Sequence, residues 1–223
     1  HLSIRRQRQM CVRDRCLIAA NLLETKVIQV FGITVTAGLL VFPISYIIND
    51  CIAEVWGFRK ARLIIWSGFA MNFFVVMLGL IAVALPAAPF WDGAAHFNFV
   101  FGMAPRIVIA SLTAFLVGSF LNAYVMSRMK LASNGRNFSA RAIWSTVVGE
   151  TADSLIFFPV AFGGIIAWRE LLVMMCIQIL LKSMYEVLIL PVTIRVVKAI
   201  KRIDGSDVYD EGISYKVWKI GDI

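Results

Sequence analysis

Long apolar stretches alternate with short charged clusters along this chain. A helix needs about 20 apolar residues to cross the hydrocarbon core of a bilayer. The stretches between the charged clusters therefore predict six membrane-spanning helices, at about Cys16–Gly32, Thr36–Trp56, Leu63–Leu85, Arg106–Met129, Ala142–Trp168 and Glu170–Ile200. The last stretch is longer than one span, so we expect its end after Pro191 to project into water as a basic helix. The pattern predicts an all-α, polytopic integral membrane protein.

The same pattern divides the chain into three segments. They are a basic segment over residues 1–15, a transmembrane domain over residues 16–200 and a tail over residues 201–223. Because Glu24 and Lys26 interrupt the first apolar stretch and no A-x-A-like site follows, we do not interpret it as a cleavable signal peptide. The sequence starts at His1 rather than at a methionine, so we expect the natural N-terminus to lie upstream.

The composition supports a membrane protein. Hydrophobic residues make up 60% and charged residues 16% of the 223 positions, and the mean hydropathy is +0.79. Average soluble domains are about 45–50% apolar and about 25% charged. A soluble globular fold and a disordered chain are therefore both excluded.

The positive charges indicate an orientation. Of the 22 Lys and Arg residues, 18 lie before the first span, between the second and third, between the fourth and fifth, or after the sixth. Only Arg106 and Arg169 lie on the opposite side. By the positive-inside rule, both termini are predicted to be cytoplasmic. The formal net charge of +8 is thus an orientation signal, and we expect no nucleic-acid partner.

The order of the spans suggests a 3+3 inverted repeat, with three spans on each side of the aromatic outside loop over residues 86–105. Two coincidences support it. Phe42-Pro43 recurs as Phe158-Pro159, and Glu54 recurs as Glu170 at the same offset.

Ionisable residues inside a span are costly, and they usually face a cavity or a partner. The candidates are Glu24, Lys26, Asp50, Glu54, Glu150, Asp153, Lys182 and Glu186. At about 1.5 Å per residue, Asp153 and Lys182 lie near the midplane and Asp50 lies nearer the cytoplasm. These three are the main site candidates. A structural ion pair between Lys182 and one aspartate is the alternative, and both roles can hold.

Other polar residues in the spans are weaker indications. Glu54 lies at the cytoplasmic boundary, so we expect it to pair with Arg59 or Arg62. The first span carries a polar stripe, made of Asn21, Thr25 and Gln29. The fourth carries a face of small residues that predicts close helix packing, with the role of Asn122 left open; the face is Ala110, Ala114 and Gly118.

Two prolines lie within predicted spans. Each of Pro43 and Pro159 removes a hydrogen bond from a helix. A broken helix that lines a binding cavity and a simple kink explain them equally well.

The sequence offers little material for catalysis. The four cysteines are scattered, His96 is the only internal histidine, and no GxSxG or HExxH motif occurs. We therefore expect no enzyme activity, no metal and no cofactor. An aspartyl dyad of Asp50 and Asp153 is the remaining formal alternative.

Several segments resemble the bacterial queuosine-precursor transporters, also called the vitamin-uptake-transporter family. In the second span these are Phe42-Pro43-Ile44, Asp50 and Val55-Trp56-Gly57-Phe58-Arg59-Lys60-Ala61-Arg62. Further along they are Ala95-His96-Phe97-Asn98, the fourth span, Ser145-Thr146-Val147-Val148-Gly149 through Asp153 to Phe157, Ala161-Phe162, Lys182 with Pro191, and Val208-Tyr209-Asp210. Two positions depart from the family pattern, with Glu150 in place of an amide and Ser154 in place of threonine.

The resemblance implies a six-helix inner-membrane importer of 7-deazaguanine bases, which are salvaged into tRNA modification. A guanine-type edge carries adjacent N–H donors that a carboxylate accepts, and a flat ring stacks on aromatic side chains. The expected substrate-binding residues are Asp50, Asp153, Lys182, Glu150, Glu186, Asn21, Asn122, Phe42, Tyr46, Phe158 and Tyr185. Its expected partners are a small-molecule substrate and the lipid bilayer, with a homodimer among the arrangements open to it. The alternative function is the substrate-binding membrane subunit of an energy-coupled vitamin importer, which would need an ATPase partner.

Overall fold

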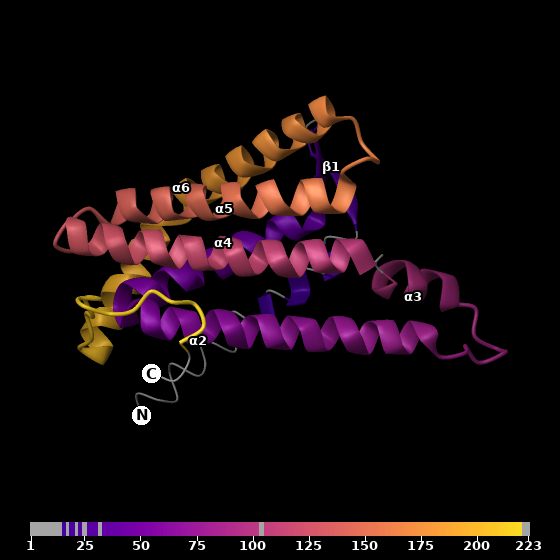
Figure 1. The fold of residues 1–223 in the computed structure, drawn as a ribbon, viewed down its shortest axis with the longest axis horizontal. Helices are drawn as coiled ribbons and strands as arrows, with labels where there is room; N and C mark the ends of the chain where they lie inside the picture. The colour runs from indigo at the N-terminus through magenta and orange to yellow at the C-terminus, as the bar shows by residue number, and fades with distance from the viewer. Residues whose placement is uncertain are drawn as a thin grey trace.

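The computed structural model describes residues 15–16, 18–20, 22–23, 26–30, 33–102 and 105–219, so most of the basic segment 1–15 lies outside it. In chain order its elements are β1 (Val27–Val30), β2 (Ile33–Thr36), the 3-10 helix η1 (Ala37–Leu40), α2 (Phe42–Ala84), α3 (Ala94–Phe101), α4 (Pro105–Ala132), α5 (Phe138–Phe162) and α6 (Trp168–Asp204). Figure 1 shows the long helices side by side, with α4 along α5 and α6 diverging from α5 at one end of the bundle.

Helix α2 consists of two limbs that reverse direction at Gly57, whose φ of 78° and ψ of 176° are not helical. Asn49 donates a hydrogen bond to Asn122 of α4, and the ring of Trp66 lies 6.0 Å from that of Phe120 on the same helix. Asn49 and Trp66 would be about 25 Å apart along a straight helix, yet both contact the same turn of α4. Gly57 therefore separates two antiparallel helices, as the predicted boundary between the second and third spans requires.

Within the described part of the chain, three helical stretches are long and apolar enough to cross a membrane: Ile47–Ala84, Ala94–Ala132 and Trp168–Asp204. They contain the third, fourth and sixth predicted spans. Large apolar side chains are exposed on them, including Phe74 and Ile81 on α2 and Leu180 and Leu188 on α6. A bilayer would cover these surfaces, because exposed apolar patches of this size are unusual on soluble monomers. The count of six spans stays a prediction.

The first predicted span is wrong over its second half. Residues 27–30 and 33–36 form an antiparallel hairpin, with Val27 opposite Thr36 and Val30 opposite Ile33. Its strands are rich in β-branched residues, with Val27, Ile28, Ile33 and Val35 among them. Such side chains lose rotamer freedom in a helix and favour strands. Apolarity alone did not separate a strand from a helix here.

The two prolines differ in position, which the symmetric interpretation did not anticipate. Pro43 lies in the first turn of α2, where its missing N–H breaks no helical hydrogen bond. Pro159 lies inside α5, one turn before the helix ends at Phe162. Of these two prolines, Pro159 alone lies within the body of a helix, so the pair that suggested an inverted repeat does not occupy equivalent positions in the fold.

The small residues of α4 are packed as expected. Ala110 and Ala114 are almost completely buried, and Gly118 is buried as well. Figure 1 shows α5 running along this helix for most of its length. Small side chains let the two backbones approach closely.

The described basic clusters, over residues 59–62, 130–141 and 201–202, lie at the end of the bundle that holds Gly57, and the tail closes that end. The Asp210 carboxylate accepts a hydrogen bond from the Phe58 N–H at 2.8 Å, next to the reversal. Arg62 donates to the carbonyl of Lys216 at 2.8 Å, and the Trp66 indole donates to the carbonyl of Val217 at 3.0 Å. Figure 1 shows the yellow tail crossing the ends of the helices there.

Candidate functional site

Three helices place five ionisable side chains in the middle of the bundle. We call these residues the central acid cluster: Asp50 on α2, Glu150 and Asp153 on α5, and Lys182 and Glu186 on α6. The Lys182 ammonium lies 2.8 Å from Glu150 and 3.9 Å from Asp153. All but Asp153 are buried. The cluster therefore holds four carboxyl groups and one base.

Helix periodicity sets the levels within this cluster. Glu150 contacts Lys182, and Thr146 and Glu186 each lie one turn from that pair along their helices. The helices are antiparallel, because Phe158 packs with Leu171 at the other end. Thr146 and Glu186 therefore share a level. The Thr146 hydroxyl donates to Asp50 at 3.5 Å, which brings Asp50 to that level too.

Several polar atoms around this level lack hydrogen-bond partners among the described residues. They are one carboxylate oxygen of Asp50, both carboxylate oxygens of Glu186, the Ser45 hydroxyl, the Asn49 carbonyl oxygen and the Asn122 amide nitrogen. Asn49 and Asn122 are joined to each other at 2.7 Å. Buried polar groups in folded proteins are nearly always paired, so a concentration of unpaired atoms is typical of a site that binds a polar ligand or water.

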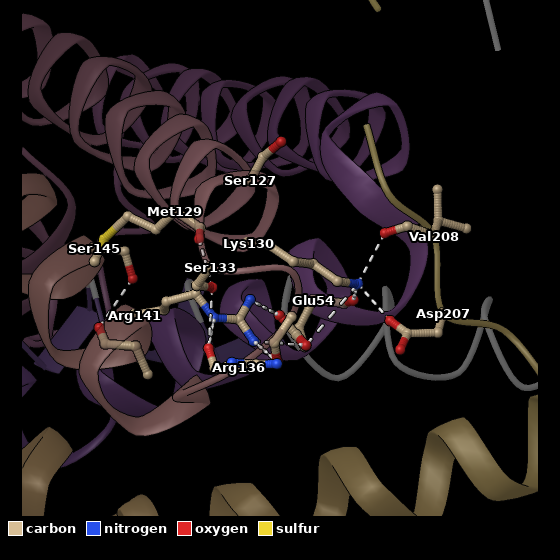
Figure 2. Close-up of polar contacts among 12 residues, drawn as sticks. Glu54, Ser127, Met129, Lys130, Ser133, Arg136, Arg141, Ser145, Asp207 and Val208 are labelled. Atoms are coloured by element: carbon tan, nitrogen blue, oxygen red, sulfur yellow. Dashed lines mark hydrogen bonds and ion pairs between the residues drawn. The ribbon is translucent and has the colours of Figure 1, made fainter. Parts of the chain in front are cut away.

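A second cluster of charged side chains lies nearer the tail, with buried, half-buried and exposed members that are paired with one another; Figure 2 labels all of them except Lys201. We call it the Glu54 cluster: Glu54, Lys130, Arg141, Lys201 and Asp207. Both guanidinium nitrogens of Arg141 donate to Glu54, at 2.5 and 3.1 Å. Lys201 lies 2.7 Å from the same carboxylate, and Lys130 lies 3.9 Å from it.

The expected partner of Glu54 was therefore wrong. Arg59 and Arg62 are close in sequence, but the reversal at Gly57 takes them onto the other limb of α2. Arg62 instead binds tail carbonyls, and the cations that reach Glu54 come from α4, α5 and α6. Proximity along the chain misled here because the helix that would have paired them is broken.

The Glu54 cluster extends to the tail through Asp207. Its carboxylate lies 2.5 Å from Lys130 and 2.9 Å from Lys201. Partial burial opposes ionisation of Asp207, but hydrogen bonds and attraction from the two lysines outweigh it and lower its pKa below the usual value. The tail is thus held by an ionised carboxylate between two cations.

The structure brings some predicted site residues together and leaves others apart. Asp50, Glu150, Asp153, Lys182 and Glu186 share the central acid cluster, and Asn122 adjoins it through Asn49. Phe158 instead packs with Leu171 and Met175 between α5 and α6. Tyr185 is half-buried beside Glu186 on α6. Asn21 and the side chains of Phe42 and Tyr46 lie outside the described residues.

Two polar residues of the site were missed by the sequence interpretation. Asn49 precedes Asp50, and Thr146 lies one turn before Glu150. Both are neutral, so a search for charged groups within spans passes over them. In the part of the chain that the structure describes, no group of three or more His, Cys, Asp or Glu side chains is placed to hold a metal ion.

Comparison with known proteins places this fold in a family. Residues 36–196 match the family model described as "Putative vitamin uptake transporter". The chain belongs to the vitamin uptake transporter family. The matched range contains every residue of the central acid cluster, whereas Lys201, Asp207 and Asp210 lie beyond it.

Two curated relatives are 27% and 31% identical to this chain over the aligned residues. A "Probable queuosine precursor transporter" of Bacillus subtilis (strain 168) is 31% identical over 156 residues, covering 66% of this chain and 65% of the relative. The "Queuosine precursor transporter" of Escherichia coli (strain K12) is 27% identical over 157 residues, covering 69% of this chain and 65% of the relative. The chain thus spans slightly less than two thirds of the length of each. No solved structure matches.

Proposed function

We propose that this protein is a multi-pass transporter of the bacterial inner membrane that imports queuosine precursors, the 7-deazaguanine bases. The central acid cluster is the observation that carries the proposal. It places buried carboxylate oxygens that have no hydrogen-bond partner among the described residues between helices that are apolar outside. Intramembrane ionisable groups mark substrate or ion pathways more often than any other role. Two relatives are named as a queuosine precursor transporter or a probable one, which supports the substrate class.

The proposed site recognises the 7-deazaguanine ligand through hydrogen bonds. Asp50 accepts the N–H donors of the guanine-type edge, because its free oxygen lies beside the one held by Thr146. Asp153 is the second acceptor, at the more open side of the cluster. Lys182 balances charge in the empty site, and the structure pairs it first with Glu150. In this proposal Phe42 and Tyr46 remain the candidates for stacking on the ring, whereas Phe158 is occupied in the packing between α5 and α6.

Transport by the purified chain alone would distinguish this proposal from the alternative function, a substrate-binding subunit that needs an ATPase partner. Vesicles containing only the purified protein should take up labelled 7-cyano- and 7-aminomethyl-7-deazaguanine, with and without a proton gradient. The subunit of an energy-coupled vitamin importer would transport nothing until its ATPase partner is added. Binding without transport by the isolated chain would therefore support the alternative.

The proposed topology has six spans, cytoplasmic termini and Gly57 at the cytoplasmic end. Reporter fusions at Phe99 and at Asn134 test it, since these residues lie on α3 and in the loop between α4 and α5. Periplasmic activity at Phe99 and cytoplasmic activity at Asn134 are expected. The reverse pattern would contradict the orientation. Light scattering in detergent would decide between a monomer and the homodimer.

A further inference from the structure

Glu186 is the most isolated charged group in the central acid cluster. Its side chain is 1% exposed, and neither of its carboxylate oxygens has a hydrogen-bond partner among the described residues. Lys182, one turn before it on α6, is already 2.8 Å from Glu150. Asp50 differs, because the Thr146 hydroxyl donates to one of its oxygens. A negative charge is therefore better stabilised on Asp50 than on Glu186.

The surroundings of Glu186 are mostly acidic. Its charge and that of Asp50 repel each other, and Glu150 repels it from α5. The titratable groups that face this region are Asp50, Cys51 and Glu54 on α2, Glu150 and Asp153 on α5, and Lys182 on α6, while α4 contributes the neutral Asn122. One base serves these acids within the cluster. A carboxylate at Glu186 would carry a desolvation cost that no hydrogen bond from the described residues offsets, whereas at Asp50 the Thr146 hydroxyl offsets part of that cost.

We propose that Glu186 holds a proton in the ligand-free protein and that this protonated carboxyl group donates a hydrogen bond to the bound base, so that ligand binding requires the proton. This inference rests on the proposed function for the identity of the ligand. A protonated carboxyl group is a hydrogen-bond donor, whereas a carboxylate only accepts. A guanine-type base presents a ring carbonyl beside its N–H donors. Asp50 as carboxylate and Glu186 as acid together match that donor and acceptor pattern.

The proton exchanges with water on whichever side the site is open, and no covalent step is involved. When the proton leaves, a second carboxylate faces the ligand carbonyl, and two acceptors meet without a hydrogen atom between them. The affinity should then fall by up to about tenfold per pH unit above the titration of Glu186. Glutamine keeps a donor at the same place and does not titrate. Glu186→Gln should therefore bind the base at every pH.

The first test needs no ligand. The infrared spectrum of the purified protein at neutral pH should contain the carbonyl band of a protonated carboxylic acid. This band should disappear in Glu186→Gln and in Glu186→Met. Two variants are used so that the test can still be made if one of them does not fold. It should persist in Glu170→Gln, which removes an exposed carboxylate from the first turn of the same helix. A spectrum in which neither variant changes this band would overturn the proton assignment.

The second test measures binding of 7-cyano-7-deazaguanine, which lacks the titratable aminomethyl group of the other precursor, from about pH 5 to about pH 9. The affinity of the parent and of Glu170→Gln should fall as the pH rises, and that of Glu186→Gln should stay level. The inference would be overturned if the affinity of the parent did not change with pH, or if the affinity of Glu186→Gln fell with rising pH as that of the parent does. A parent that binds nothing at any pH but shows the infrared band would instead contradict the proposed function and leave the proton on Glu186 established.

Discussion

The two clusters of charged side chains differ in how completely they are paired. In the Glu54 cluster, one carboxylate receives Arg141 and Lys201 at 2.5–2.7 Å, and Lys130 and Asp207 complete the network. In the central acid cluster, four carboxyl groups surround Lys182, and oxygens of Asp50 and Glu186 have no partner among the described residues. About one helical turn separates Asp50 from Glu54.

This difference indicates that the Glu54 cluster stabilises the fold and that the central acid cluster is able to bind a ligand. A buried charge with several good partners is costly to disturb, because removing one partner leaves the others unpaired. A buried charge without partners contributes nothing comparable to stability, so its presence calls for another reason. The Glu54 cluster joins α2, α4, α5, α6 and the tail, whereas the central acid cluster leaves capacity for new hydrogen bonds.

The largest effect is expected from Glu54→Gln. This change leaves three buried or half-buried cations without their carboxylate, and breaking such a pair costs about 3–5 kcal/mol. We expect loss of folded protein or a large fall in thermal stability in detergent, measured by size exclusion and thermal unfolding. Glu211→Gln removes an exposed carboxylate and serves as the control. A Glu54→Gln protein as stable as the control would mean that the paired cluster is not what joins the helices.

The next effect is expected from Gly57→Ala. The backbone at Gly57 occupies a region that is nearly exclusive to glycine and costs about 1–3 kcal/mol for other residues. An added Cβ would also lie 2.5 Å from a carboxylate oxygen of Asp210. Gly164 has a φ of +80° but open space around it, so Gly164→Ala measures positive φ without the contact. Thermal unfolding should show a larger loss of stability for Gly57→Ala than for Gly164→Ala. Equal losses would mean that the contact between the tail and Gly57 does not contribute to stability.

A smaller effect on stability is expected from Asp50→Asn. Its carboxylate accepts a long hydrogen bond from Thr146, and the change removes a buried negative charge from a cluster with four carboxyl groups and one base. We expect the free energy of unfolding to stay within about 1 kcal/mol of the parent. Chemical denaturation alongside Glu54→Gln makes the comparison direct. Destabilisation as large as that of Glu54→Gln would show that both clusters are structural.

The smallest effect concerns the tail at low pH. The pKa of Asp207 is lowered in the folded protein, so its contribution to stability is present above the unfolded value of 3.8 and disappears as the pH falls through the lower folded value. Hydrogen exchange at the Val208 N–H, which donates to Val55, should become faster relative to its intrinsic rate in that acid range. In Asp207→Asn it should already be fast at neutral pH. Exchange that is independent of both changes would mean that other contacts hold the tail.

Much of the fold could be predicted from apolar length and the positions of basic residues. The boundary at Gly57, the burial of Ala110, Ala114 and Gly118 and the gathering of basic segments at one end follow from these patterns. The hairpin over residues 27–36 does not, because an apolar run does not distinguish a strand from a helix. The difference between Pro43 and Pro159 depends on where each helix begins, which the apolar pattern locates poorly.

The site divides in the same way. Charged residues within apolar stretches pointed to Asp50, Glu150, Asp153, Lys182 and Glu186, because a charge in such a place needs a reason. Which acid Lys182 contacts first depends on the rotation of α5 against α6, and this rotation has no signature in the sequence. The partners of Glu54 come from three other helices, so only the assembled bundle could identify them.

Equilibrium binding of 7-cyano-7-deazaguanine to folded Asp50→Asn tests the central claim most directly. Asparagine replaces one acceptor by a donor, and each mispaired group facing the N–H edge costs roughly 1–3 kcal/mol. Affinity should fall about 5- to 150-fold relative to the parent, while Asp92→Asn, an exposed aspartate between α2 and α3, should bind like the parent. Equal affinities for the parent and for Asp50→Asn would contradict the assignment of the central acid cluster as the ligand site.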